Sequence, residues 1–221
     1  MRQIALAIAL ALATTAVAAQ DGGTSRVNGS IRIEPGQAGG DLDTVNGSIR
    51  IGNGARVGDA ETVNGSVTVG DDVQADGLAT VNGSVRVGKR ARIAGSLETV
   101  NGQVFVDAGS RIGGDVETVN GSIGLVATQL AGDIETVSGD VTVGIDSRVR
   151  GGIHVEKPGS SSWFNRKPRP PRIVIGPNAV VDGPLVFERE VEVFVHRTAR
   201  TGKISGPAKV TAYEGERPPA N

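Results

Sequence analysis

The sequence contains no cysteine, and only 3% of its 221 residues are aromatic. The absence of cysteine excludes disulfides, thiolate metal sites and a lipid attached to a cysteine. Because aromatic side chains are so few, the core has to be built from Val, Ile, Leu and Ala, and the β-branched types among these favour strands. The formal net charge of −1 supplies no overall field toward nucleic acid or a membrane surface.

Residues suited to catalysis are also scarce. The chain has two histidines, His154 and His196, and neither has a partner at metal-ligand spacing. The sequence shows no Ser-His-Asp order and no nucleophile elbow. The Gly52-Asn53-Gly54 fragment lacks the strand-to-helix context that a phosphate-binding loop requires. We therefore expect no catalytic residue, no metal and no cofactor.

The first nineteen residues have the anatomy of a secretory signal peptide. A basic start at Arg2 is followed by an apolar run from Ile4 to Ala13, and the residues up to Ala19 fit a cleavage site. This run is too short and too rich in small residues to be a lasting transmembrane span. We expect residues 1–19 to be removed and the protein to be exported to the periplasm, the cell surface or the medium.

The sequence is rich in glycine, with 33 residues, and in one repeated motif. The stretch Glu-Thr-Val-Asn-Gly-Ser at residues 61–66 recurs with small changes, and its Asn returns every 18 or 19 residues. Apolar residues recur at fixed offsets from this Asn, so each unit has three short apolar stretches. Such regularity indicates a repeat protein whose units stack on one another. The repeated residues are Asn28, Asn46, Asn64, Asn82, Asn101 and Asn120, with Ser138 in the seventh place.

Two folds compete to explain the motif. Asn-Gly between apolar residues is the strongest short-range signal for a β-hairpin, which would give an antiparallel meander. Hairpins need no strict period, however, whereas stacked coils place like side chains on one another. We predict an all-β fold, a parallel β-solenoid of roughly triangular section with 18–19-residue coils and unknown handedness. The Gly would supply a corner conformation that a Cβ forbids, and the Asn would either adopt the left-handed region or stack in a ladder.

The repeat pattern also sets the expected boundaries. Solenoid repeats span residues 20–156 and continue over residues 173–206, giving about nine coils and a rod about 40 Å long. Residues 207–221 read as a polar tail. Residues 157–172 stand where an Asn-Gly corner is due, and we interpret them as an inserted loop.

The inserted loop is basic and aromatic. Such a composition suits an adhesive patch for an acidic glycan, a lipid headgroup or a protein partner. The alternative is that its aromatic residues cover a face of the solenoid while its basic part is a linker. The candidate binding residues are Trp163, Phe164, Arg166, Lys167, Arg169 and Arg172.

Charged residues recur in two columns. Acids at a coil spacing could serve polysaccharide hydrolysis or calcium binding, but a column present on nearly every coil is more typical of a solvated face. The cationic column is either a stripe that opposes aggregation or a ladder of charges for a linear polyanion. The acids are Asp43, Glu61, Glu98, Glu117 and Glu135, with Asp41, Asp59, Asp115 and Asp133 two residues before four of these column positions. The cations are Arg56, Arg92, Arg111 and Arg148, interrupted by Gln74 and Leu130.

The segments GDVETVNGSIGL (114–125) and GDIETVSGDVTV (132–143) resemble a bacterial family of β-solenoid adhesins. The wider V-x-V-G-x-x-V-x-G-D-I cadence is similar to that of the bactofilins, which are polymer-forming β-helical cytoskeletal proteins. The likeness covers roughly residues 27–155 and resumes from residue 173. It implies a non-enzymatic solenoid that self-associates or adheres and has no cofactor. A signal peptide does not suit a cytoplasmic filament, and the basic loop has no place in the simple repeat.

From these observations we expect an exported structural or adhesive solenoid at the cell envelope. It would act by surface interaction or self-association, with further copies of itself or an acidic envelope glycan as partner and no nucleic acid. The alternative is a carbohydrate-active β-helix enzyme or an acyltransferase. The stretch VIGPNAVVDGPL (174–185) is similar to hexapeptide-repeat acyltransferases, although no histidine stands in a matching context.

Overall fold

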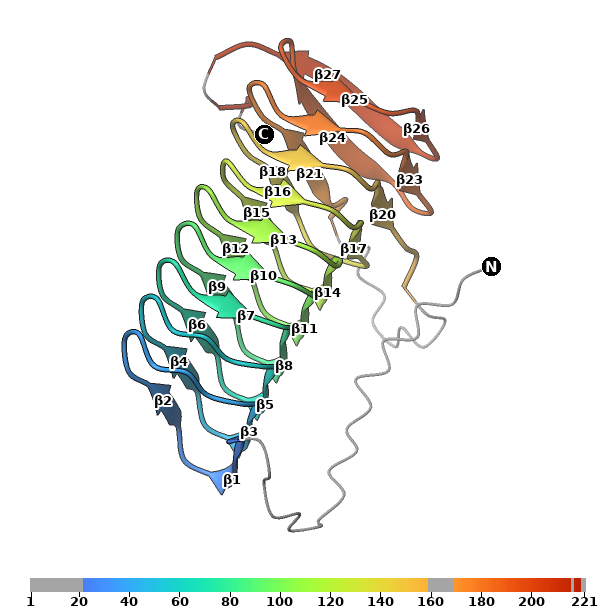
Figure 1. Ribbon diagram of the computed structural model, residues 1–221. Helices are drawn as coiled ribbons and strands as arrows, with labels where there is room; N and C mark the ends of the chain where they lie inside the picture. The colour runs from blue at the N-terminus through green and yellow to red at the C-terminus, as the bar shows by residue number, and fades with distance from the viewer. Residues whose placement is uncertain (1–21, 159–168, 216, 220–221) are drawn as a thin grey trace.

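Most of the short apolar stretches alternate buried and solvent-facing side chains and form strands, whereas the stretch around Val57 makes only isolated bridges. The computed structural model describes residues 22–158, 169–215 and 217–219, which wind into a solenoid of stacked coils (Figure 1). These residues form 27 strands and no helix. Neighbouring strands pair in parallel, coil on coil, along the whole length of the solenoid. The all-β parallel solenoid is therefore confirmed, and the antiparallel meander is excluded.

Three sheets form the sides of the solenoid. The first sheet contains β1 (Thr24–Asn28), β3 (Leu42–Asn46), β5 (Ala60–Asn64), β8 (Leu78–Asn82), β11 (Leu97–Asn101), β14 (Val116–Asn120), β17 (Ile134–Thr136), β20 (Ile153–Val155), β23 (Leu185–Phe187) and β26 (Ile204–Ser205). The second contains β2 (Ile31–Ile33), β4 (Ile49–Ile51), β6 (Val67–Val69), β9 (Val85–Val87), β12 (Val104–Val106), β15 (Ile123–Leu125), β18 (Val141–Val143), β21 (Arg172–Ile175), β24 (Val191–His196) and β27 (Ala208–Tyr213). The third contains β7 (Gln74–Ala75), β10 (Arg92–Ile93), β13 (Arg111–Ile112), β16 (Gln129–Leu130), β19 (Arg148–Val149), β22 (Val180–Val181) and β25 (Arg200–Thr201).

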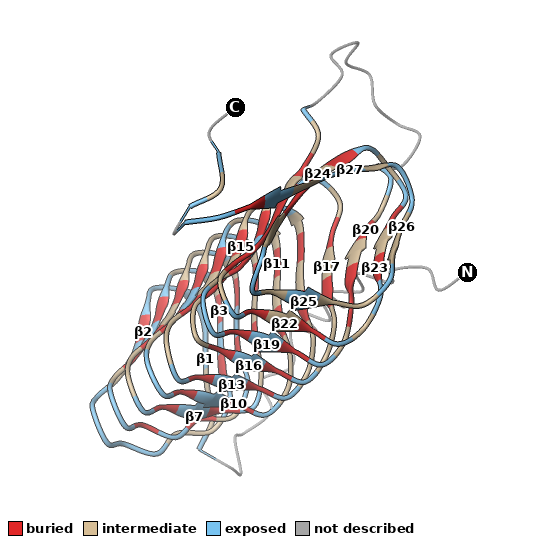
Figure 2. Cartoon of the chain, turned by 90° about the horizontal axis from the view of Figure 1, so that it is seen from above, coloured by how far each residue is buried: buried red, intermediate tan, exposed pale blue. Residues whose placement is uncertain are grey.

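The core runs as one column along the solenoid axis. Inward-facing Val, Ile, Leu and Ala from all three sheets form a single cluster, and Figure 2 shows buried residues on the strands and exposed ones mainly at the corners. The threonine of the repeat is buried as well, because its hydroxyl has a partner inside the corner. Thr62 Oγ1 donates to the Gly47 carbonyl at 2.8 Å, and Thr80 Oγ1 donates to the Gly65 carbonyl at 2.8 Å. The buried hydroxyl of this threonine is thus satisfied by the corner of the preceding coil.

The Asn-Gly corners stack in register along one edge. Asn64 Nδ2 donates to Asn46 Oδ1 at 3.0 Å, and Asn82 Nδ2 donates to Asn64 Oδ1 at the same distance. Equivalent bonds connect the other asparagines from Asn28 to Asn120, so the corner holds a continuous ladder. The sequence allowed either a left-handed backbone conformation or a stacked ladder for this Asn, and the structure shows the ladder.

The corner glycine is required because successive coils approach closely, and not because of its backbone conformation. We expected a backbone conformation that a Cβ forbids, but Gly65 does not have a positive φ. A Cβ built on Gly65 would instead lie 1.9 Å from the carbonyl oxygen of Gly47, the corner glycine of the preceding coil. The close approach of successive coils therefore excludes any side chain at this position.

The C-terminal end differs from the expected polar tail. β27 (Ala208–Tyr213) pairs in parallel with β24 over six residue pairs and extends the second sheet. Its sequence, Ala-Lys-Val-Thr-Ala-Tyr, resembles a tail because most of its side chains face solvent, and Tyr213 alone is fully buried. With this strand, ten strands stack in each of the first two sheets, which is one coil more than the nine expected. Nine spacings of about 4.8 Å give a length of about 43 Å.

Candidate functional site

The arginine column lies on the outer face of the third sheet. Arg92 pairs with Arg111, Arg111 with Gln129, and Gln129 with Arg148, so these positions form one row across neighbouring coils. Gln74 pairs with Arg92, and one isolated bridge from Arg56 to Gln74 extends the row toward the N-terminus. Because side chains alternate along a strand, the next residue of each strand points inward; Ile93 and Ile112, for example, are buried. The period-two alternation thus places every member of the row in solvent.

One position of the predicted row was wrong. We expected Leu130 to interrupt the arginines, but Leu130 is buried in the core and Gln129 occupies the row. The turn before β16 has three residues, 126–128, whereas the turn before β13 has four, 107–110. A fixed offset of ten residues from the Asn therefore selects Leu130 in this coil, one residue beyond the true row position. Because side chains alternate along a strand, this error exchanges an outward side chain for an inward one.

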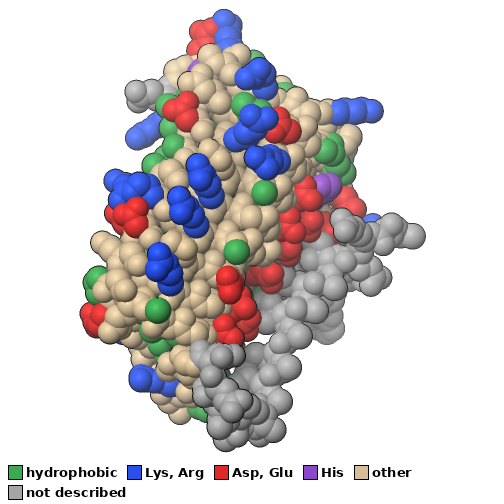
Figure 3. Space-filling view, in the orientation of Figure 1, with side chains coloured by type: hydrophobic (Ala, Val, Ile, Leu, Met, Phe, Trp, Pro, Cys, Tyr) green, Lys and Arg blue, Asp and Glu red, His purple; other side chains and the backbone are tan. Residues whose placement is uncertain are grey.

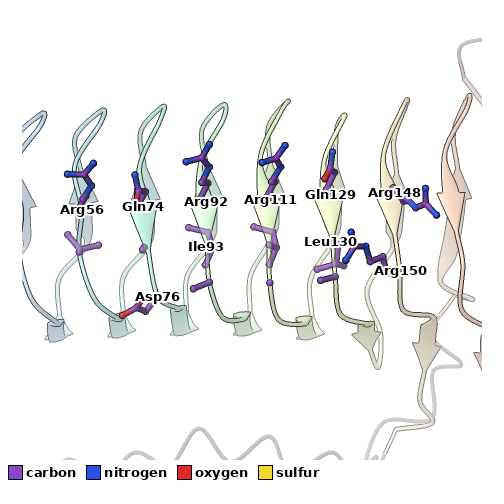
Figure 4. A pocket seen from close by; sticks show the side chains of 16 residues that line it. Arg56, Gln74, Asp76, Arg92, Ile93, Arg111, Gln129, Leu130, Arg148 and Arg150 are labelled. Atoms are coloured by element: carbon purple, nitrogen blue, oxygen red, sulfur yellow. The ribbon is translucent and has the colours of Figure 1, made fainter.

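The row borders a groove of about 850 Å³. Figure 4 shows Arg56, Gln74, Arg92, Arg111 and Gln129 projecting in the same direction from successive coils. Beside them lie small exposed residues, Ala94, Gly113 and Ala131, which leave the adjoining surface open. We call this feature the arginine groove; its charged and amide side chains are Arg56, Gln74, Asp76, Arg92, Arg111, Gln129, Arg148 and Arg150.

The groove is strongly positive although the whole chain is nearly neutral. Its lining includes five arginines and one aspartate, Asp76. Arg148 turns toward the following coil, where its Nη2 lies 3.0 Å from Asp182 Oδ2. Arg56, Arg92 and Arg111 take part in none of the ion pairs that the described residues form. Their guanidinium donors are available to a ligand from solvent.

The acids form a separate stripe on the first sheet. Figure 3 shows Asp and Glu side chains gathered in a band apart from the Lys and Arg side chains. Glu98 pairs with Glu117, Glu117 with Glu135, and Glu135 with His154. We call this the acidic stripe; its members are Asp43, Glu61, Glu98, Glu117 and Glu135, with Ala79 at the coil between Glu61 and Glu98.

Several carboxyl groups of the acidic stripe have raised pKa values. Partial burial, reinforced by the charges of Glu98 and Glu135, raises the pKa of Glu117 to about 7. Burial likewise raises the pKa of Asp43, Glu61 and Glu98 above their ordinary values. Within the described ranges, no three His, Asp or Glu side chains are grouped so that they could hold a metal ion.

The aspartates that precede members of the acidic stripe by two residues hold successive coils together. Asp41 Oδ1 accepts the Asp59 N–H at 3.0 Å, and Asp115 Oδ1 accepts the Asp133 N–H at 2.7 Å. Asp133 Oδ1 in turn accepts the Gly152 N–H at 2.6 Å. Each carboxylate thus binds a backbone donor of the next coil at the corner between the third and first sheets.

In the sequence the predicted loop lies between β20 and β21, the strands of the first and second sheets that flank the Asn edge in this coil. Trp163, Phe164, Arg166 and Lys167 lie outside the described residues. Arg169 Nη2 lies 2.6 Å from Asp140 Oδ2, and the Arg172 N–H donates to Asp140 Oδ1 at 2.9 Å. The Arg172 guanidinium also stacks over the Phe194 ring at 4.4 Å and donates to the Pro219 carbonyl. These two cations therefore serve contacts within the fold.

Comparison with models of protein families, with curated proteins and with solved structures finds no match. Among the described residues there is no helix of the length and hydropathy needed to cross a membrane. The arginine column could be predicted from the sequence, but Arg150 and the open surface beside the column were not predicted. A weak signal for that surface was present in the small residues Ala94, Gly113 and Ala131, each two positions after a member of the row.

Proposed function

We propose that this protein is an exported, non-enzymatic solenoid that acts at the cell envelope as a structural or adhesive element. Three long sides, each built from in-register strands, offer extended surfaces whose side chains repeat at the coil spacing. The observation that carries the proposal is the arginine groove, whose row of four arginines and two glutamines runs along six successive coils, with Arg56, Arg92 and Arg111 outside the ion pairs of the described residues. Such a row matches an extended partner better than a small substrate, since its members spread along the axis instead of converging on one point.

Self-association is the second mode of action that we propose. The strands β1 and β27 end the first and second sheets, at opposite ends of the solenoid. Terminal strands present unpaired backbone N–H and C=O groups, which can pair with another chain. Val27 on β1 is 65% exposed and Val210 on β27 is 51% exposed, so both ends also offer apolar surface.

A carbohydrate-active enzyme is the alternative, and Glu117 is the observation that favours it. A carboxyl group with a pKa of about 7 suits a general acid. However, its neighbours Glu98 and Glu135 stand in the same row one coil away, and the same environment recurs on successive coils. A repeated position of this kind supports a solvated stripe more than a single catalytic centre.

The proposal is tested by locating the protein in a bacterium that expresses the full chain. We expect it in the envelope or periplasmic fraction, with a mature N-terminus near Gln20 measured by mass spectrometry. We also expect incubation with envelope polysaccharides to give binding without turnover. A full-length chain in the cytoplasm, or turnover that Glu117→Gln abolishes, would contradict the proposal.

Two variants identify the adhesive surface in the same assay. Replacing residues 159–168 by a short Gly-Ser linker removes the aromatic and basic part of the loop, whereas Arg92→Gln with Arg111→Gln weakens the groove. Loss of envelope retention in the second variant alone assigns adhesion to the groove. Loss in the first alone assigns it to the loop.

A further inference from the structure

We infer that the arginine groove binds an unbranched acidic polysaccharide laid parallel to the solenoid axis. This inference rests on the proposed adhesive function and names the chemical class of its ligand. Arg56 and Arg148 are separated by five coil steps, or about 24 Å at the strand spacing. The row can therefore follow several sugar units of one chain.

The order of side chains along the row matches two kinds of group on such a polymer. Arg92 and Arg111 stand next to one another, and Gln74 and Gln129 flank them on the adjoining coils. A guanidinium offers a planar pair of donors that fits a carboxylate or sulfate. A glutamine amide both donates and accepts, as sugar hydroxyls do. A polymer that carries anionic groups and hydroxyls along one chain satisfies both.

The surface beside the row is open enough for a polysaccharide chain to bind along it. Ala94, Gly113 and Ala131 line the groove and are exposed, so no long side chain rises there from the coils between Asp76 and Arg150. Asp76 and Arg150 stand at the two ends of this strip. A linear polymer fits the strip, whereas a branched one would meet the side chains of the row.

The residues that line the groove also favour an acidic polysaccharide over nucleic acid and over an anionic membrane surface. Proteins that bind single-stranded nucleic acid stack bases on aromatic side chains, and the groove lining has no aromatic residue. Membrane surfaces are bound by apolar residues that insert beside the cations. The apolar residues at the groove, such as Ile93, Ile112 and Leu130, are buried in the core instead.

The test measures binding of the full chain to polygalacturonate and to heparin, with dextran as a neutral polymer and oligothymidylate as a nucleic acid. Because Gln already occupies two positions of the row, Arg92→Gln with Arg111→Gln is a conservative change. We expect this variant to bind the acidic polysaccharides about tenfold more weakly. The matched control is Arg32→Gln with Arg50→Gln, an adjacent arginine pair on the second sheet, which should bind within about twofold of the unmodified chain.

Oligomers of increasing length test the orientation along the axis. Affinity should rise with length until the oligomer spans the row and then level off, and binding should weaken as salt increases. The inference is overturned by equal losses in the two double variants, by affinity that does not depend on length, or by tighter binding of oligothymidylate than of either polysaccharide. Envelope retention without binding of any acidic polysaccharide would overturn this inference and leave the proposed function standing. Thermal unfolding of each variant shows that the fold is retained.

Discussion

Arg92 and Arg111 occupy paired positions on β10 and β13, so two guanidinium groups project side by side from adjacent coils. Like charges placed directly opposite each other in a sheet are destabilising. The fold carries this cost at the centre of the groove, where neither arginine is in an ion pair of the described chain. The placement is understandable if the energy is recovered when an anion binds between them.

The first prediction concerns the stability cost of this pair. We expect Arg111→Gln to raise the free energy of unfolding by about 0.2–1 kcal/mol at low salt, because the repulsion with Arg92 is removed. At about 1 M salt the gain should disappear. Thermal unfolding at the two salt concentrations measures the effect. Arg56→Gln is the control, since the paired neighbours of Arg56 are Ala38 and Gln74 and it should show no gain. A loss of stability in Arg111→Gln would mean that the guanidinium supports the fold.

The second prediction concerns the asparagine ladder. Asn64 is a donor to Asn46 and an acceptor from Asn82, so Asn64→Ala removes two hydrogen bonds. We expect a loss of about 1–2 kcal/mol in the free energy of unfolding, measured by urea denaturation. Asn28 accepts one such bond at the end of the ladder, and Asn28→Ala should cost about half as much. Equal costs at the two positions would show that the ladder bonds do not contribute separately.

The third prediction separates close approach from backbone conformation in the glycines. A Cβ on Gly83 would lie 1.8 Å from the Gly65 carbonyl oxygen, so Gly83→Ala should force two coils apart and cost about 3 kcal/mol or more. Gly54 has a φ of +69° and nothing within 4 Å of a built Cβ. Gly54→Ala should therefore cost about 1–2 kcal/mol from backbone strain alone. Urea denaturation of both variants compares the two effects, and a milder loss at Gly83 than at Gly54 would refute the steric account.

The fourth prediction follows from the acidic stripe. The pKa of Glu117 is about 7 in the folded protein and 4.5 for an ordinary glutamate, so between these pH values the folded state holds a proton that the unfolded state has released. Stability should therefore fall as pH rises from about 4.5 to about 7. The raised pKa values of Asp43, Glu61 and Glu98 act in the same direction.

The variant Glu117→Gln checks this account, because it keeps the side chain neutral at every pH. We expect its melting temperature to exceed that of the unmodified chain by about 2–4 °C at about pH 8, which corresponds to about 1 kcal/mol after allowance for solvent screening. At about pH 4 the two proteins should melt together. Glu34→Gln, outside the stripe, is the control. A lower melting temperature for Glu117→Gln at about pH 8 would contradict the predicted direction.

The coil and its columns could be predicted from the sequence because the repeat records them directly. The same Asn, Gly and apolar residues return in each unit. Because equivalent residues of successive coils stack on one another, the period of the sequence predicts which residues are in contact. The prediction failed where the period changes locally. A turn one residue shorter before Gln129 exchanged Leu130 with its neighbour, and a fixed offset cannot detect where within a coil a residue has been lost.

The last strand and the groove were harder to foresee for a different reason. β27 lies on the second sheet at the end of the solenoid and buries little beyond Tyr213, so its sequence lacks the alternation of a strand in the middle. The groove depends on what is small beside the arginines, and glycine and alanine are so frequent in this chain that their positions carried no clear signal. Both features arise from the stacking of coils, which a single unit does not display.

The equal spacing of the coils has an evolutionary consequence. Asn46, Asn64 and Asn82 occupy equivalent corners with identical pairing, so duplicating or deleting the 18 residues between two of them would join matching edges and leave the remaining coils unchanged. Each such event would add or remove one position of the row on the third sheet. The length of polymer that the protein engages, and hence its avidity, can therefore change in whole steps through gene rearrangement without any redesign of the core.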